Sequence, residues 1–143
     1  MRKMIKLAAI CLVLVSVLSL IDILGDKQIL RESVIRLHVV GASNEETDQQ
    51  IKLQVRDVIT DWLSHNLSGA ETAEEATEFL LGNLNHIEAE ANRALEQAGV
   101  QDRASVSFQR ESFPVRDYDT FSLPSGVYSS LRIRIGKATG RNW

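Results

Sequence analysis

The first 24 residues limit the fold most, because they set an apolar leader apart from the globular remainder. Three basic residues among the first six precede an apolar run over residues 7–21 that only Ser16 and Ser19 interrupt. A charged start followed by such a run is the pattern of a secretory signal peptide. The run is shorter than the ~20 residues of a membrane-spanning helix, which favours a cleaved leader over a retained anchor. We therefore predict a signal peptide or membrane anchor over residues 1–24.

The charges of this leader also predict where the rest of the chain goes. Positive charges before an apolar segment hold the N-terminus in the cytoplasm, so everything beyond Gly25 is expected on the far side of the membrane. The expected location is secreted or extracytoplasmic. If the leader is retained, the chain is anchored to the membrane through its N-terminal segment.

Length and charge limit what the chain beyond the leader can be. Removing the first 24 of the 143 residues leaves 119, enough for one domain with one core. The single cysteine, Cys11, lies in the leader, so the remainder has neither a disulfide nor a thiolate zinc site. The remainder has 13 basic and 18 acidic residues, a net charge of −5, which argues against binding to nucleic acid.

Hydrophobic spacing predicts the first half of this domain. Residues 25–33 are polar and suit a tether, and residues 34–40 alternate as a strand does, with Arg36 and His38 on its polar face. Ser43 and Glu46 form a capping-box pattern, so a helix is expected to begin there and to run to about His65, with Lys52 and Arg56 away from its core stripe.

The second half repeats these signals. Thr72 and Glu75 predict a second capped helix that ends at Gly99, with a kink or break at Gly82. Strands are predicted over residues 104–113 and 127–135, while 115–123 fits a loop or a short edge strand. The fold class is therefore α+β: a small, mainly antiparallel sheet with two long helices on one face, in the order strand, helix, helix, strand, strand, over residues 34–143.

Patterns of catalytic or cofactor-binding residues are weak. His38, His65 and His86 lie in different elements without metal-ligand spacing, so we predict no metal site. The glycines at 136 and 140 do not form a Walker A loop, and no nucleophile motif is visible, so neither a cofactor nor an enzymatic activity is predicted.

Four blocks resemble the stage II sporulation protein R family in the same order along residues 35–143. The first block is Ile35-Arg36-Leu37-His38-Val39-Val40, leading through Ser43 to Asp48-Gln49-Gln50-Ile51-Lys52. Phe113-Pro114 with Tyr118 resembles that family's F-P-x-x-x-Y, and Pro124-Ser125-Gly126-Val127-Tyr128 resembles its P-A-G-x-Y. Residues 135–143 resemble its glycine-rich ending in Asn-Trp, although Ala138 stands where the family has glycine, and the family continues beyond Trp143.

The resemblance implies a signalling protein that the forespore exports into the space between the two membranes of the sporangium. Its partner would be a membrane-embedded aspartic protease of the mother cell, which then cleaves the precursor of the mother-cell sigma factor. In this role the chain is a ligand and not a catalyst.

Candidate partner-binding residues come from the strand faces and from the resemblance. They are Arg36, His38, Tyr118, Tyr128, Asn142 and Trp143. Two alternatives stay open: a cell-wall enzyme whose fold gathers Asp117, Asp119 and His38, and a membrane-tethered structural protein that keeps its leader.

Overall fold

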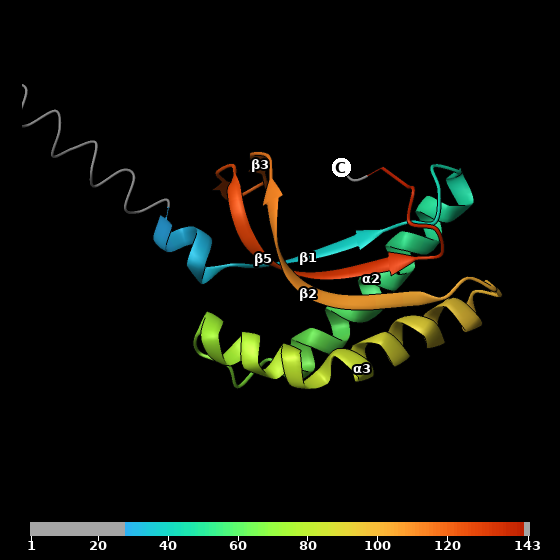
Figure 1. Cartoon of the computed structure of the whole chain (residues 1–143), viewed down its shortest axis with the longest axis horizontal. Helices are drawn as coiled ribbons and strands as arrows, with labels where there is room; N and C mark the ends of the chain where they lie inside the picture. The colour runs from blue at the N-terminus through green and yellow to red at the C-terminus, as the bar shows by residue number, and fades with distance from the viewer. Residues whose placement is uncertain (1–27, 142–143) are drawn as a thin grey trace, which may run out of the picture.

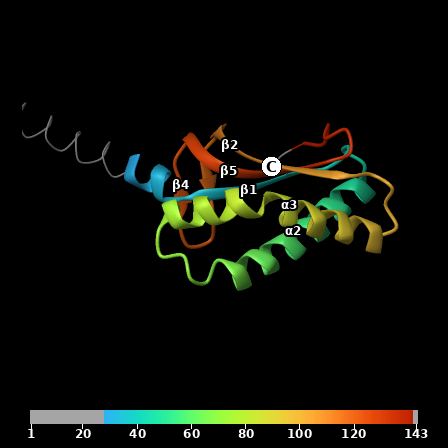
Figure 2. The ribbon, with the colours of Figure 1, turned by 60° about the horizontal axis from the view of Figure 1, so that its bottom comes forward.

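The computed structural model describes residues 28–141, in which a three-stranded sheet carries two long helices. Figures 1 and 2 show both helices on the same face of the sheet. The elements in chain order are β1 (Ile35–Val40), α2 (Glu46–Asn66), α3 (Ala73–Gln97), β2 (Ala104–Phe113), β3 (Arg116–Asp117), β4 (Ser122–Leu123) and β5 (Gly126–Ile135). The predicted α+β class and element order are confirmed.

The last long strand, β5, lies in the middle of the sheet. The strand order is β1-β5-β2, with β5 parallel to β1 and antiparallel to β2. The sheet is therefore mixed, with one pair of each kind. Within the described residues β1 and β2 are its two edges.

The core lies between the sheet and the helices. Alternate residues of β1 and β5 point into it, as their spacing predicts: Val39, Leu131, Ile133 and Ile135 are buried there. Two positions on α2 differ from the predicted core stripe. Val58 is 39% exposed, whereas Lys52, predicted on the polar side, is buried because the C-terminal segment covers it.

The capping box predicted at Ser43 is wrong. The helix begins at Glu46, after Glu45, whose side chain makes no capping bond. The Ser43 hydroxyl instead donates to Asp48 Oδ2 at 2.5 Å. The reason is tertiary: Thr139 N donates to Ala42 O at 3.1 Å, so the C-terminal segment holds this loop in place.

The second helix agrees more closely with its prediction. Thr72 Oγ1 accepts a bond from Glu75 N at 3.2 Å, while the Glu75 carboxylate accepts from Glu71 N at 2.8 Å. The helix continues without interruption through Gly82, so the break considered there does not occur. Gly99 has φ +73° and comes after the helix end, as predicted.

Residues 115–123, which the sequence left as a loop or a short edge strand, form a small hairpin in which β3 pairs with β4. At the other end of the chain, residues 28–33 of the predicted tether are helical, and Arg31 Nη2 donates to Ser125 O at 2.7 Å. The predicted leader, residues 1–24, lies outside the described residues. In the part of the chain that is described, no helix is long and apolar enough to cross a membrane.

Candidate binding groove at a sheet edge

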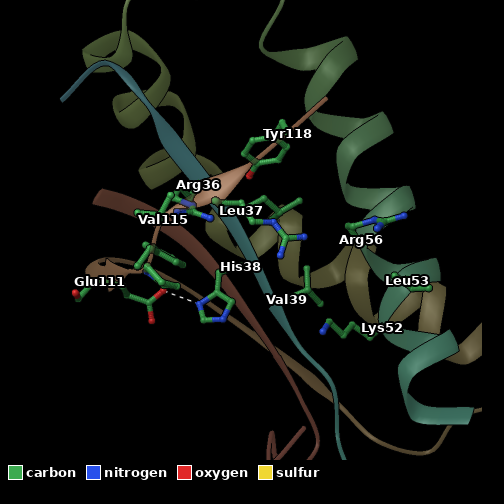
Figure 3. Close-up of a pocket in the computed structure, with 14 residues that line it drawn as sticks. Arg36, Leu37, His38, Val39, Lys52, Leu53, Arg56, Glu111, Val115 and Tyr118 are labelled. Carbon is green, nitrogen blue, oxygen red and sulfur yellow. Dashed lines mark hydrogen bonds and ion pairs between the residues drawn. The ribbon is translucent and has the colours of Figure 1, made fainter. Parts of the chain in front are cut away.

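A groove of about 600 Å³ lies beside β1. One wall is α2 and the other is the chain from the end of β2 into the hairpin (Figure 3). Its lining residues are Arg36, Leu37, His38, Val39, Lys52, Leu53, Arg56, Glu111, Ser112, Phe113, Pro114, Val115, Arg116 and Tyr118. We call this the β1 groove.

Arg36 lies on the sheet face opposite the helices and rests on aromatic rings. Its guanidinium carbon is 4.0 Å from the centroid of the Phe113 ring and 5.5 Å from that of Tyr128. Both distances are within the range of a cation–π interaction, which holds the charge in place without neutralising it. Arg36 Nη1 is buried and has no hydrogen-bond partner among the described residues.

His38 lies two residues further along β1 on the same face, and its side chain contacts Glu111 of β2. Its Nδ1 is 2.7 Å from Glu111 Oε2, the contact drawn in Figure 3, and Arg132 Nη1 donates to Glu111 Oε1 at 2.7 Å. Burial of the Glu111 carboxyl raises its pKa, but hydrogen bonds from His38, Ser130 and Gln109 and the charge of His38 together leave the pKa below its ordinary value. The one carboxylate that lines the groove is therefore already engaged.

Two cations come from α2. Burial lowers the pKa of Lys52, and the positive charge of Arg56 lowers it further. Lys52 Nζ donates to the carbonyl of Arg141 at 3.1 Å, so it connects the helix to the C-terminal segment. Arg56 is about half exposed. Among the described residues, its one ion pair is with its exposed neighbour Asp57, at 2.6 Å.

Apolar side chains add to this charged lining. Leu53 of α2 is 42% exposed, Val115 is 57% exposed and Tyr118 is 45% exposed. The Tyr118 ring stacks on Phe121 with centroids 4.7 Å apart, which fixes the tip of the hairpin beside the groove. Cations next to exposed apolar surface suit the binding of another molecule.

The predicted partner-binding residues fall into three groups. Arg36, His38 and Tyr118 all line the β1 groove. Tyr128 is fully buried; its hydroxyl donates to Pro124 O at 2.5 Å, and its ring supports Phe113. Asn142 and Trp143 lie outside the described residues. That any of these residues binds a partner stays a prediction.

Several lining residues escaped the sequence argument. Glu111 is 73 positions from His38, and Lys52 and Arg56 lie on what the spacing presents as a solvated helix face. A usable signal was present for Lys52, Phe113 and Pro114, because they belong to blocks that carry the family resemblance.

Two residues of the enzyme alternative have hydrogen-bond partners outside the proposed set. His38 pairs with Glu111, whereas Asp117 accepts a hydrogen bond from Ser122 Oγ at 2.6 Å. Across residues 28–141, no three His, Cys, Asp or Glu side chains gather as a metal site would require.

The fold and the groove define a small α+β domain with a cationic groove at a sheet edge. The model of the family described as stage II sporulation protein R matches residues 31–143. The chain therefore belongs to the stage II sporulation protein R family. Stage II sporulation protein R of Bacillus subtilis (strain 168) is 30% identical over 115 residues, which are 80% of this chain and 51% of that relative. The chain thus spans about half the length of this relative. No solved structure matches.

The blocks that carry the resemblance gather in two places. Arg36, Phe113 and Tyr128 stack beneath the groove. Ser43 and Gly140 meet where the C-terminal segment contacts the β1–α2 loop, and a side chain on Gly140 would have no room against the Ser43 carbonyl. Both clusters join segments that are distant in the sequence.

Proposed function

We infer that this chain is an exported sporulation signal that activates a membrane-embedded aspartic protease, which then processes the precursor of the mother-cell sigma factor. The family match over residues 31–143 carries this proposal, because it includes nearly all of the described domain. The signalling role, the protease and the sigma factor come from what the family resemblance implies.

Two further features support a role in binding. The β1 groove offers Arg36, Arg56 and Arg116 beside exposed apolar side chains, a combination that can recognise a protein surface. The basic, apolar leader supports export to the compartment between the two membranes of the sporangium, where the protease would be reached.

The test is processing of the sigma-factor precursor in sporulating cells that lack their native signal. One strain receives this chain, and a second receives the chain extended by the remaining C-terminal part of the Bacillus subtilis relative. Processing in the first strain supports the proposal, and processing in the second strain alone assigns the signal to the longer protein. Absence of processing in both, with the proteins present by immunoblot, would overturn the proposal.

A pair of charge variants ties the readout to the groove. Arg36→Ala removes the groove cation that rests on Phe113, while Arg103→Ala removes an arginine that is 76% exposed and outside the groove lining. We expect processing to fall severalfold with Arg36→Ala and to stay unchanged with Arg103→Ala. Equal processing in both variants would exclude the groove from signalling.

A further inference from the structure

The β1 strand leaves one edge of the sheet open. β5 pairs with β1 on one side, and within residues 28–141 no strand pairs with its other side. An edge strand carries a row of backbone N–H and C=O groups that another strand can use. The open edge runs over six residues, Ile35–Val40.

The β1 groove runs along this edge. Four successive residues of β1, from Arg36 to Val39, line it. Successive side chains of a strand point to opposite faces of the sheet, so what these four residues share is the strand edge itself. Figure 3 shows α2 lying alongside β1 and Lys52 reaching toward the strand from it. A groove with a strand edge along it has the shape that accepts an extended peptide.

The charges in the groove select the chemistry of that peptide. Its lining holds Arg36, Arg56 and Arg116, besides His38, against the single carboxylate of Glu111. That carboxylate is already held by His38 and Arg132. Lys52 adds a charge that contacts Arg141 O, and Arg56 also pairs with its neighbour Asp57, which is not part of the lining. The whole chain has a net charge of −3, so the groove is a local cationic region on an acidic protein. It complements acidic side chains, and the exposed Leu53 and Val115 complement apolar ones.

We propose that the β1 edge binds, by strand addition, an extended segment of another protein in which acidic and apolar side chains alternate. Each wall of the groove carries a cation and an exposed apolar side chain, Arg56 with Leu53 on α2 and Arg116 with Val115 on the other wall. The acidic side chains can therefore meet a cation on one wall while the apolar ones pack on the other. The backbone bonds supply affinity, while the side chains supply specificity. The proposal rests on the proposed function only in naming the protease as the source of the bound segment. The binding site itself is argued from the structure alone.

A second copy of the chain is a poorer occupant. Pairing two β1 edges would bring two copies of the same cationic lining together, and like charges facing one another oppose association. An acidic segment of another protein gains from the same charges. The choice between the two occupants can be measured.

The probe is a short synthetic peptide of alternating glutamate and valine, about eight residues long to span the edge at ~3.3 Å per residue. Its affinity for the full chain in detergent is measured by fluorescence anisotropy. Two modified probes carry N-methyl groups on alternate residues, each blocking one edge of the peptide backbone. A lysine–valine peptide tests the sign of the charge.

Strand addition predicts that one N-methylated probe loses binding while the other keeps it. The variant with both Arg56→Glu and Arg116→Glu should bind the unmodified probe about tenfold more weakly, while Arg103→Glu should bind it within about twofold of the wild type. Arg56, Arg103 and Arg116 are all exposed, so the three substitutions leave the core intact. The lysine–valine peptide should not bind.

Three outcomes would overturn the proposal. These are no binding of the glutamate–valine probe, equal binding of both N-methylated probes, and a dimer of the chain by analytical ultracentrifugation that the double variant dissociates. Because the assay contains no protease and no sporulating cell, its failure would leave the complementation test of the proposed function unaffected. Equally, failure of complementation would leave peptide binding in place.

Discussion

At the residue scale, Ala138 is an alanine with a left-handed backbone. Its φ is +52°, a region that costs a residue with a Cβ about 1–2 kcal/mol. Its N–H donates to Ile135 O at 3.0 Å and closes the turn after β5, and the next residue, Thr139, donates from N to Ala42 O at 3.1 Å. Ala138 therefore lies where the chain leaves the turn for the β1–α2 loop. The family resemblance places glycine here, and the backbone supplies the physical reason.

Replacing Ala138 with glycine should therefore stabilise the domain. Relief of the left-handed strain exceeds the ~0.4–1 kcal/mol lost through a freer unfolded chain, which leaves a net gain of about 0.5–1 kcal/mol. Urea unfolding of the full chain in detergent, monitored by circular dichroism, measures this gain. The control is Ala89→Gly in the middle of α3, which should cost about 1 kcal/mol. A loss of stability in both variants would contradict the account.

Glu111 makes a pH-dependent contribution to stability. Its pKa is lowered in the folded state from an ordinary value of 4.5, so the unfolded chain binds this proton more tightly. The contribution is therefore fully present above pH 4.5 and is lost as the pH falls through the lowered folded pKa. In Glu111→Gln, the free energy of unfolding should depend less steeply on pH in that window.

The same variant should also be less stable at neutral pH, by about 1–3 kcal/mol, because His38 and Arg132 lose a charged hydrogen-bond acceptor. Urea midpoints from about pH 3 to 7 measure both effects. Parallel pH profiles for the wild type and Glu111→Gln would show that the carboxylate is not responsible.

At the scale of elements, hydrogen bonds join the C-terminal segment to the β1–α2 loop, and we call this set of contacts the C-terminal clamp. Gly140 N donates to Gly41 O at 3.1 Å, and Arg141 N donates to Asn44 Oδ1 at 2.6 Å. A Cβ on Gly140 would lie 2.6 Å from Ser43 O and 2.8 Å from Gly41 O. Because those atoms are backbone, they cannot move aside cheaply.

Gly140→Ala should release this clamp. We expect faster amide hydrogen exchange at Gly41, Ser43 and Lys52 and a free energy of unfolding lower by about 1–3 kcal/mol. Gly82→Ala is the matched control, since a Cβ there meets no atom within 4 Å and the helix gains about 1 kcal/mol. If both alanines stabilise the chain, the clamp is not needed for the fold.

The bounds of the strands could be predicted from local sequence patterns, but their order in the sheet could not. The alternation over residues 104–113 predicts β2 with its observed bounds, and β1 and β5 are each found within one residue of their predicted start. Alternation is local, so one segment suffices to see it. The insertion of β5 between β1 and β2 depends on contacts across the whole chain, and no single segment contains that information.

The candidate site divides in the same way. Arg36 and His38 could be chosen from the sequence because they share the polar face of one strand. Their contacts with Phe113 and Glu111 could not be predicted, since these residues reach them only through the pairing of β1 and β2 with β5. The failure at Ser43 has the same origin: a loop that resembles a helix cap is held instead by the end of the chain.

At the scale of the whole molecule, the net negative charge of the chain repels an acidic peptide, whereas the arginines of the groove attract it at close range. Salt shortens the reach of both, from a Debye length of ~10 Å at 0.1 M to ~3 Å at 1 M. An acidic segment bound in the groove meets Arg36, Arg56 and Arg116 at close range, whereas the net charge of −3 is spread over the molecule. Attraction in the groove should therefore dominate binding, and salt should weaken it.

We expect the affinity of the glutamate–valine peptide for the full chain to fall about tenfold between roughly 0.05 and 0.5 M sodium chloride. The variant with both Arg56→Glu and Arg116→Glu should show a smaller dependence, because two of the attracting charges are reversed. A serine–valine peptide of the same length is the control; it should bind more weakly and with little effect of salt, since only backbone bonds and apolar contacts hold it. If the acidic peptide bound equally well at both salt concentrations, the strand edge and the apolar lining would account for recognition, and the arginines would have no part in it.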